Sequence, residues 1–203
     1  MSRSAKPGDW APEGHIRMAR ADDGDEIAAI YRPSVIDAAT SFEIDAPDGG
    51  EMARRIEAVL AVAPWLVCVG PAGDIVGYAY AGRHRERPAY RWSVDVTVYI
   101  RADHHRRGIG RALYGVLFDL LRLQGFCVAH AGITLPNAGS VGLHEALGFR
   151  PVGVYPAVGW KLGAWRDVGW WQRPLRELPP APSPPLSLRQ AQALDAWPAV
   201  LRD

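Results

Sequence analysis

The sequence has little of what marks several special classes of protein. It has two cysteines in 203 residues, Cys68 and Cys127, and both lie in apolar runs without the spacing of a metal site or a disulfide framework. Its 23 Lys and Arg residues against 22 Asp and Glu residues leave a formal net charge of +1, which gives no bulk electrostatic reason to expect nucleic acid or an anionic membrane as a partner. No apolar run approaches the ~20 residues of a membrane span, and the first residues lack a signal-peptide core. We therefore expect a cytoplasmic protein with reduced cysteines.

The length and the 48% hydrophobic content fit one globular domain with short extensions at both ends. Residues 1–14 show no periodicity and are expected to be a flexible N-terminal extension. Residues 15–177 form the predicted domain. Residues 178–203 form a tail that begins with a stiff proline-rich segment, 178–185. Residues 186–201 could then form a short amphipathic helix, which could dock on a neighbouring subunit.

Within the domain, strand and helix patterns alternate. Helical spacing follows the acidic pair Asp22 and Asp23, and recurs over 48–62, 109–123 and 138–147. Runs rich in β-branched and aromatic residues predict strands over 16–19, 65–69, 75–81, 92–100, 126–135, 151–162 and 165–175. This order predicts an α/β fold with a mixed sheet rather than a doubly wound one.

The most informative stretch runs from a strand into a basic, glycine-containing turn and then into the longest helix. The turn contains Arg106, Arg107, Gly108 and Gly110. Glycines let the backbone approach a ligand, and the free N–H groups of a first helical turn favour an anion. The simpler interpretation is a strand-to-helix turn with an incidental basic patch. Two adjacent arginines in a strand–loop–helix context favour the anion site.

This loop resembles that of the GNAT superfamily of acetyltransferases, whose Arg/Gln-x-x-Gly-x-Gly/Ala motif holds the pyrophosphate of coenzyme A. His105 stands where the motif usually has Gln or Arg, so we expect a modestly altered affinity. Further blocks resemble the phosphinothricin/methionine sulfone (sulfoximine) acetyltransferase group over about 16–175: Thr-Ser-Phe-Glu at 40–43, Gly-Tyr-Ala-Tyr-Ala-Gly at 77–82, Ala-Tyr-Arg-Trp at 89–92, Leu-Pro-Asn at 135–137, Ser-Val-Gly-Leu-His-Glu-Ala-Leu-Gly-Phe at 140–149 and Asp-Val-Gly-Trp at 167–170.

The resemblance implies a GNAT fold, with a mixed central sheet of about seven strands flanked by about four helices. It also implies a homodimer, acetyl-CoA as co-substrate and no metal. Asn137 would contact the pantetheine arm of acetyl-CoA, although a turn or helix-capping role is equally open. The residues expected to bind acetyl-CoA are Val98, Tyr99, Ile100, His105, Arg106, Arg107, Gly108, Ile109, Gly110, Arg111, Asn137 and Ser140.

Two residues are candidates for proton transfer. Acetyl transfer needs a neutral amine, so a base near the substrate helps. Asp95 stands where the resembling group has its proposed base, a Glu; being one methylene shorter, it could act through a bridging water. The alternative is a solvent-facing strand Asp, which strands disfavour. By the same resemblance His144 is a second acid/base or a partner of the first, against the alternative of a structural helix histidine.

The residues expected to bind the acceptor are Phe42, Tyr80, Arg85, Arg87, Tyr90, Tyr114, Thr134 and Val168. Arg85 and Arg87 match basic positions that hold the acidic end of the substrate, and an Arg fork suits a carboxylate or phosphinate. A charged hairpin is otherwise usually a solvated turn. Tyr114 could equally be a core aromatic residue. Trp160 replaces a residue that is commonly Phe in the group.

These features predict an acetyl-CoA-dependent N-acetyltransferase that acetylates the α-amine of a small amino-acid analogue, such as phosphinothricin or methionine sulfone or sulfoximine, by direct transfer. Neither cysteine lies in a catalytic motif. One alternative is a GNAT enzyme with a different acceptor, such as a polyamine, an aminoglycoside or a protein N-terminus. Another is a non-catalytic module that senses acetyl-CoA, because His105 and Asp95 both depart from the pattern.

Overall fold

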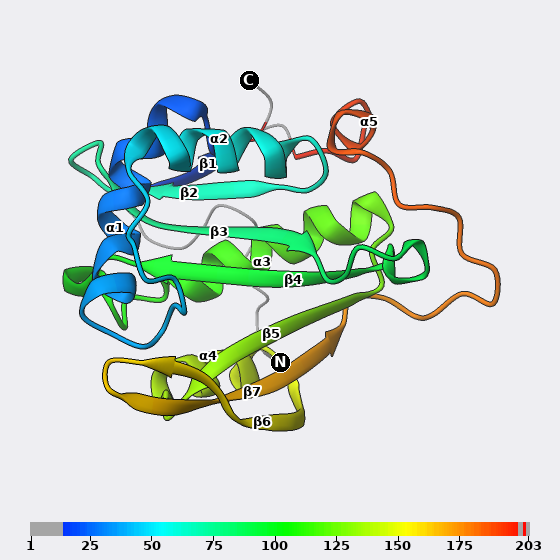
Figure 1. The fold of residues 1–203 in the computed structure, drawn as a ribbon. Helices are drawn as coiled ribbons and strands as arrows, with labels where there is room; N and C mark the ends of the chain where they lie inside the picture. The colour runs from blue at the N-terminus through cyan, green and yellow to red at the C-terminus, as the bar shows by residue number, and fades with distance from the viewer. Residues whose placement is uncertain (1–13, 199–200, 202–203) are drawn as a thin grey trace.

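The computed structural model describes residues 14–198 and 201, and its centre is one seven-stranded sheet (Figure 1). The strand order is β1-β2-β3-β4-β5-β7-β6. Every neighbouring pair is antiparallel except β4 and β5, so the predicted mixed sheet is confirmed. The strands are β1 (His15–Met18), β2 (Trp65–Val69), β3 (Ile75–Arg83), β4 (Ser93–Ile100), β5 (Val128–Leu135), β6 (Arg150–Lys161) and β7 (Ala164–Pro174).

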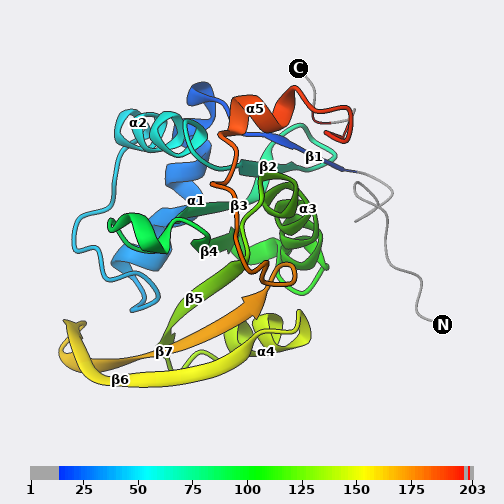
Figure 2. The ribbon, with the colours of Figure 1, turned by 90° about the vertical axis from the view of Figure 1, so that its right-hand side faces the viewer.

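Helices cover both faces of the sheet (Figure 2). On one face lie α1 (Gly24–Ile36) and α2 (Gly49–Leu60); on the other lie α3 (Ile109–Gln124) and α4 (Ala138–Ala146). A fifth short helix, α5 (Leu188–Gln192), packs beside α3. Three 3-10 helices complete the described chain: Ala21–Asp23, Pro88–Tyr90 and Ala102–His104. Among the described residues, no helix is both long and apolar enough to cross a membrane.

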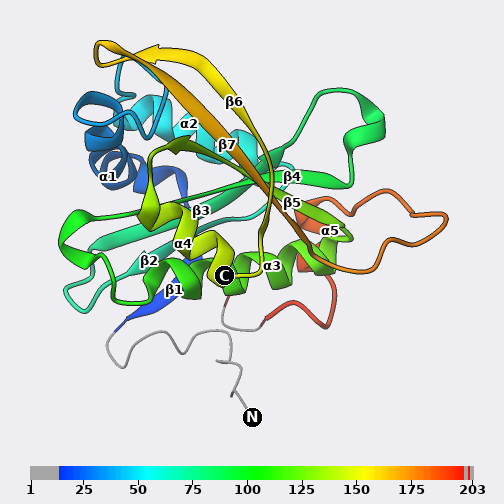
Figure 3. The ribbon, with the colours of Figure 1, turned by 90° about the horizontal axis from the view of Figure 1, so that it is seen from below.

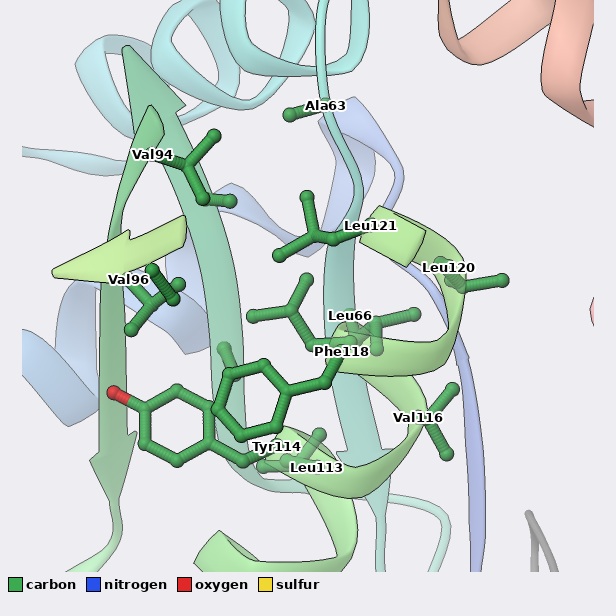
Figure 4. Packing of buried hydrophobic residues seen from close by; sticks show 14 of the residues in the cluster. Ala63, Leu66, Val94, Val96, Leu113, Tyr114, Val116, Phe118, Leu120 and Leu121 are labelled. Carbon is green, nitrogen blue, oxygen red and sulfur yellow. The ribbon is translucent and has the colours of Figure 1, made fainter. Parts of the chain in front are cut away.

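The sheet separates two apolar layers, and β4 contributes to both. Val94 and Val96 are buried in the layer under α3, where they face Leu113 and its neighbours (Figure 4). Because strand side chains alternate, Asp95 and Tyr99 lie on the opposite face, toward α1 and α2. This alternation places one polar residue, Asp95, between two core valines.

The parallel ladder between β4 and β5 is short. It joins Ser93–Asp95 to Val128–His130, after which the two strands diverge (Figures 1 and 3). β4 continues to Ile100 with β3 as its neighbour, while β5 turns away to pair with β7. The β5-facing edge of β4 after Asp95 therefore has no neighbouring strand within the described chain, and its backbone groups are available to a ligand.

The predicted element boundaries hold to within about two residues, because local capping signals fix them. The side chain of Asp48 accepts from the N–H of Glu51 at 2.8 Å and starts α2. Gly108, at φ +83°, precedes α3, and Gly125, at φ +96°, ends it; both positions require the left-handed conformation that glycine adopts without strain.

The tail differs from its prediction. Its helix ends at Gln192 instead of extending to residue 201, and Ser187 and Gln190 form a capping box at its start. The apolar residues of the tail join the main core of their own chain, because α3 leaves an apolar strip for them to cover; they are Leu188, Ala191, Trp197 and Leu201. Residues 1–13, expected to be flexible, lie outside the described residues.

Candidate active site

The basic turn forms an anion-binding geometry at the start of α3. Gly108 occupies the N-cap position without a side chain that could satisfy the first N–H groups of the helix. Arg106 also adopts a positive φ, 62°, and the side chains of Arg106, Arg107 and Arg111 are exposed around the turn. Unsatisfied N–H groups, the helix dipole and three guanidinium groups together fit the diphosphate of coenzyme A.

His105 supports this turn. Its Nε2 donates to the backbone oxygen of Ile100 at 2.9 Å, since a carbonyl can only accept. The bond ties the turn back to the end of β4. Arg101 adds a second attachment through ion pairs with Asp74 and, at 2.8 Å, Asp103. His105, which replaces the Gln or Arg usual in the motif, therefore stabilises the loop through this hydrogen bond.

The remaining residues expected to bind acetyl-CoA border the gap between β4 and β5. Val98, Tyr99 and Ile100 lie on the part of β4 that has lost β5 as a neighbour. On the other side of the gap, Asn137 follows β5 and caps α4, its side-chain oxygen accepting from the N–H of Ser140 at 3.0 Å. An extended amide-containing arm such as pantetheine suits an opening edged by free backbone groups.

Asp95 lies on the last paired rung before the gap, opposite His130 on β5. It is half-buried, and its Oδ1 accepts from Nδ1 of His84 at 2.7 Å. Burial raises the pKa of the Asp95 carboxyl, and the bond to His84 partly offsets the rise. A carboxylate with a raised pKa beside an opening in the sheet has the properties of a candidate base.

His84 was not among the predicted site residues. Its ring stacks on His130 with centroids 4.1 Å apart, and it makes T-shaped pairs with Tyr90 and Trp170 at centroid distances of 5.9 Å and 6.1 Å. Burial and the nearby charges of His84 and Arg85 lower the pKa of His130 to about 4, so His130 is neutral at ordinary pH. No local pattern marks His84, because its partners come from three other segments of the chain.

Most of the residues expected to bind the acceptor lie on the same face as Asp95. Tyr80 pairs with Thr97, two residues after Asp95 on β4, and Thr134 pairs with Val168 where β5 has separated from β4. Arg85 lies over the Trp170 ring at 5.6 Å. The others are further out: Tyr90 touches the His84 ring, Phe42 packs against Gly159 of β6 where a Cβ would not fit, and Arg87 lines an outer groove of about 350 Å³ with Pro184 and Pro185.

A polar network holds the segment that carries Phe42. Lys161 is buried, and its Nζ donates to the backbone oxygens of Ser41, at 2.8 Å, and Glu43. Arg55 of α2 donates twice to the Glu43 carboxylate, at 2.8 and 3.0 Å, and lowers its pKa. Next to this network, Tyr31, Arg55 and Tyr80 line a cavity of about 240 Å³. The sequence indicated the Thr-Ser-Phe-Glu block but not the distant residues that fix it.

Tyr114 and His144 lie on the opposite face from Asp95. Tyr114 is fully buried in the α3 layer, with its hydroxyl directed toward β4 (Figure 4). The hydroxyl donates to Nε2 of His144 at 3.1 Å, because Nδ1 of His144 donates to the oxygen of Ser140 at 2.8 Å. Burial lowers the pKa of His144 and so favours its neutral form. The structure does not bring Tyr114 to the face that carries the other expected acceptor residues; its surroundings are those of the core aromatic alternative.

Comparison with known proteins identifies the family of the chain. Residues 16–170 match the family model of the acetyltransferase (GNAT) domain. The phosphinothricin N-acetyltransferase of Streptomyces viridochromogenes is 40% identical over 169 residues, 83% of this chain and 91% of that protein. The L-methionine sulfoximine/L-methionine sulfone acetyltransferase of Pseudomonas aeruginosa is 40% identical over 109 residues, 54% of this chain and 63% of that protein.

A solved structure extends the likeness to the fold and to a bound co-substrate. The GNAT superfamily phosphinothricin acetyltransferase of Sinorhizobium meliloti, in complex with acetyl-CoA, superposes with a TM-score of 0.79 at 33% identity, covering 87% of this chain and 99% of that one. The chain therefore belongs to the GNAT acetyltransferase family, as an N-acetyltransferase of the phosphinothricin and methionine sulfoximine/sulfone group.

Proposed function

We propose that the protein transfers the acetyl group of acetyl-CoA directly to the α-amine of a small amino-acid analogue of the phosphinothricin or methionine sulfone/sulfoximine type. The observation that carries this proposal is the position of Asp95, a half-buried carboxylate on the last β4–β5 rung. A thioester held along the free edge of β4 would lie beside it. The proposal is supported further by the anion-binding turn at the other end of that edge.

In the proposed reaction, the Asp95 carboxylate draws a proton from the incoming ammonium through a group that bridges its short side chain to the amine. The freed lone pair attacks the thioester carbonyl, and a backbone N–H of the β4 edge between Val96 and Ile100 stabilises the negative charge that develops on oxygen. Breaking the carbon–sulfur bond leaves the electron pair on sulfur, which takes up a proton. The chain needs to supply only positioning, a base and hydrogen-bond donors.

Acceptor choice follows from charge. Arg85 is held over Trp170 near Asp95, where it can bond two oxygens of a carboxylate or phosphinate. Arg83, Arg87 and Arg91 line the adjacent outer groove and make its field positive. An acceptor with an acidic group is attracted, while a polyamine or aminoglycoside is repelled.

A thiol-release assay with acetyl-CoA tests the acceptor class. Phosphinothricin, methionine sulfone, spermidine and an N-terminal peptide amine are compared at equal concentration. Turnover confined to the first two is the expected result. Turnover on spermidine or the peptide would overturn the acceptor assignment, and tight binding of acetyl-CoA without turnover on any amine would identify a sensing module.

We propose also that the protein acts in the cytoplasm as a homodimer joined through β6. This strand is at the edge of the sheet and exposes an apolar surface: Val152, Val154, Tyr155, Val158 and Trp160. Edge strands with such surfaces are usually covered. Light scattering should give twice the chain mass for the wild type and for Leu178→Arg, at an exposed position in the tail, but the single-chain mass for Val154→Arg. A monomeric wild type would overturn the dimer.

A further inference from the structure

His84 and Asp95 form a pair in which the carboxylate orients the imidazole. The Asp95 Oδ1 atom accepts from Nδ1 at 2.7 Å, so the proton of a neutral His84 ring lies on Nδ1. Among the residues that the structure describes, this is the only hydrogen bond of the ring. Nε2 is therefore left without a protein partner and with its lone pair available. About 13% of the side chain remains exposed, which gives the ring a route for proton exchange with solvent.

The surroundings of His84 fix its orientation. The His130 ring lies nearly parallel to it, at an interplanar angle of 16°, and the rings of Tyr90 and Trp170 form T-shaped pairs with it. The titratable or charged groups that face the pair are His130 from β5, Tyr80 from β3, Tyr90 from the 3-10 helix and the neighbouring Arg85. Because His130 is neutral, it supports the ring without placing a second positive charge against a protonated His84.

We infer that His84 is the catalytic residue that takes the amine proton through Nε2, and that Asp95 is the positioning residue that orients it. The inference rests on the proposed function and sharpens it. Nδ1 is bound to the carboxylate, so Nε2 is the ring nitrogen left to accept a proton, and the imidazole extends the short Asp95 side chain through that bond. The same division of roles operates wherever a carboxylate holds a histidine base in the productive tautomer.

The proton balance is complete without another reactant. The ammonium group of the acceptor gives one proton to Nε2, which frees the lone pair that forms the nitrogen–carbon bond. The carbon–sulfur bond breaks, its electron pair stays on sulfur, and sulfur takes the second proton. The third proton remains on the amide nitrogen. The imidazolium then returns its proton to solvent and His84 is neutral again.

The decisive variant is His84→Asn, because an Asn amide can still donate to Asp95 from near the position of Nδ1 but has nothing at the position of Nε2. If His84 accepts the proton, this variant loses about 10²–10⁴-fold in kcat, keeps its KM for acetyl-CoA, and loses the acid limb of the pH profile. The matched control is His15→Asn, the same substitution at an exposed position on β1, which should keep the wild-type kcat.

A second measurement does not depend on turnover. Nitrogen NMR of the histidine rings of the wild type reports which ring atom carries the proton, and Nδ1 is expected for His84. Near wild-type kcat in His84→Asn, or a proton found on Nε2, would overturn the role of His84 while leaving the acetyltransferase in place. A wild-type protein that acetylates no amine would overturn the proposed function and this inference together, so the two failures are distinguishable.

Discussion

Asp95 and His130 face each other across the last rung of the β4–β5 ladder, at the point where the sheet opens. One side chain is an acid and the other a base, and burial acts on both: it raises the pKa of Asp95 and lowers that of His130. Burial disfavours the charged form of each group, so it makes the Asp95 carboxylate more basic and keeps His130 neutral. Beside them the ladder ends, which leaves the β5-facing edge of β4 without a neighbouring strand among the described residues.

The buried, neutral His130 makes the fold sensitive to acid. Its pKa falls from 6.5 to about 4 on folding, so the unfolded chain binds the proton more readily. Above about pH 6.5 His130 is neutral in both the folded and the unfolded protein. The free energy of unfolding falls as the pH is lowered from there toward about 4. We expect the Tm of His130→Phe to fall by less than the Tm of the wild type when the pH drops from about 7 to about 5. Parallel losses in thermal melts of the two proteins would contradict the assignment.

Gly108 should control the affinity for acetyl-CoA. Its φ of +83° costs any other residue about 1–2 kcal/mol, although a Cβ would meet open space. We expect Gly108→Ala to raise the KM for acetyl-CoA by about 5- to 30-fold with little change in kcat. Gly115→Ala in α3 is the control, since that position is open and helical and its KM should not move. Equal KM values for the wild type and Gly108→Ala would count against the anion site.

Lys161 should affect the binding of the acceptor rather than the binding of acetyl-CoA. Replacing it with Met leaves the backbone oxygens of Ser41 and Glu43 buried without their donor, at a cost of about 1–3 kcal/mol in the free energy of unfolding. Because the segment with Phe42 is then released, KM for the acceptor should rise while KM for acetyl-CoA stays constant. Arg54→Met, at an exposed position, should change neither value. Steady-state kinetics and denaturant melts measure both effects.

The tail should be required for stability. Trp197 is buried in the core of its own chain and donates from Nε1 to the oxygen of Leu201 at 3.3 Å. Trp197→Ala is expected to lower the free energy of unfolding by about 3–5 kcal/mol. Leu178→Ala, at a residue 72% exposed, should lower it by less than about 0.5 kcal/mol. Similar denaturant midpoints for the two variants would show that the tail does not dock.

The effect of the buried Tyr114–His144 pair on stability can be measured separately from any effect on catalysis. Tyr114→Phe removes the donor to Nε2 of His144 and should cost about 1–3 kcal/mol of stability. If the pair is structural, kcat at a temperature where the variant is folded stays close to that of the wild type. A loss of kcat without loss of stability would instead support the catalytic role that the resemblance implies for His144.

Local signals made much of this fold readable from the sequence. The strand, the basic turn and the apolar face of α3 are contiguous, so this strand–turn–helix unit could be predicted directly. His84, Asp95 and His130 come from three segments, and only the sheet register brings them together. Lys161 lies 120 residues from Ser41 in sequence. The surface on which the tail docks could not be predicted either, because the apolar residues of the tail indicate that they are buried but not which surface buries them.

The most direct test of the central claim is kcat/KM for acetyl transfer to phosphinothricin, measured for the wild type, Asp95→Asn and the surface control Asp119→Asn. A loss of about 10²–10⁴-fold in Asp95→Asn alone, with unchanged affinity for acetyl-CoA, is expected if the β4–β5 opening carries the proton transfer. Equal kcat/KM for all three proteins would contradict the claim and move the chemistry away from this rung.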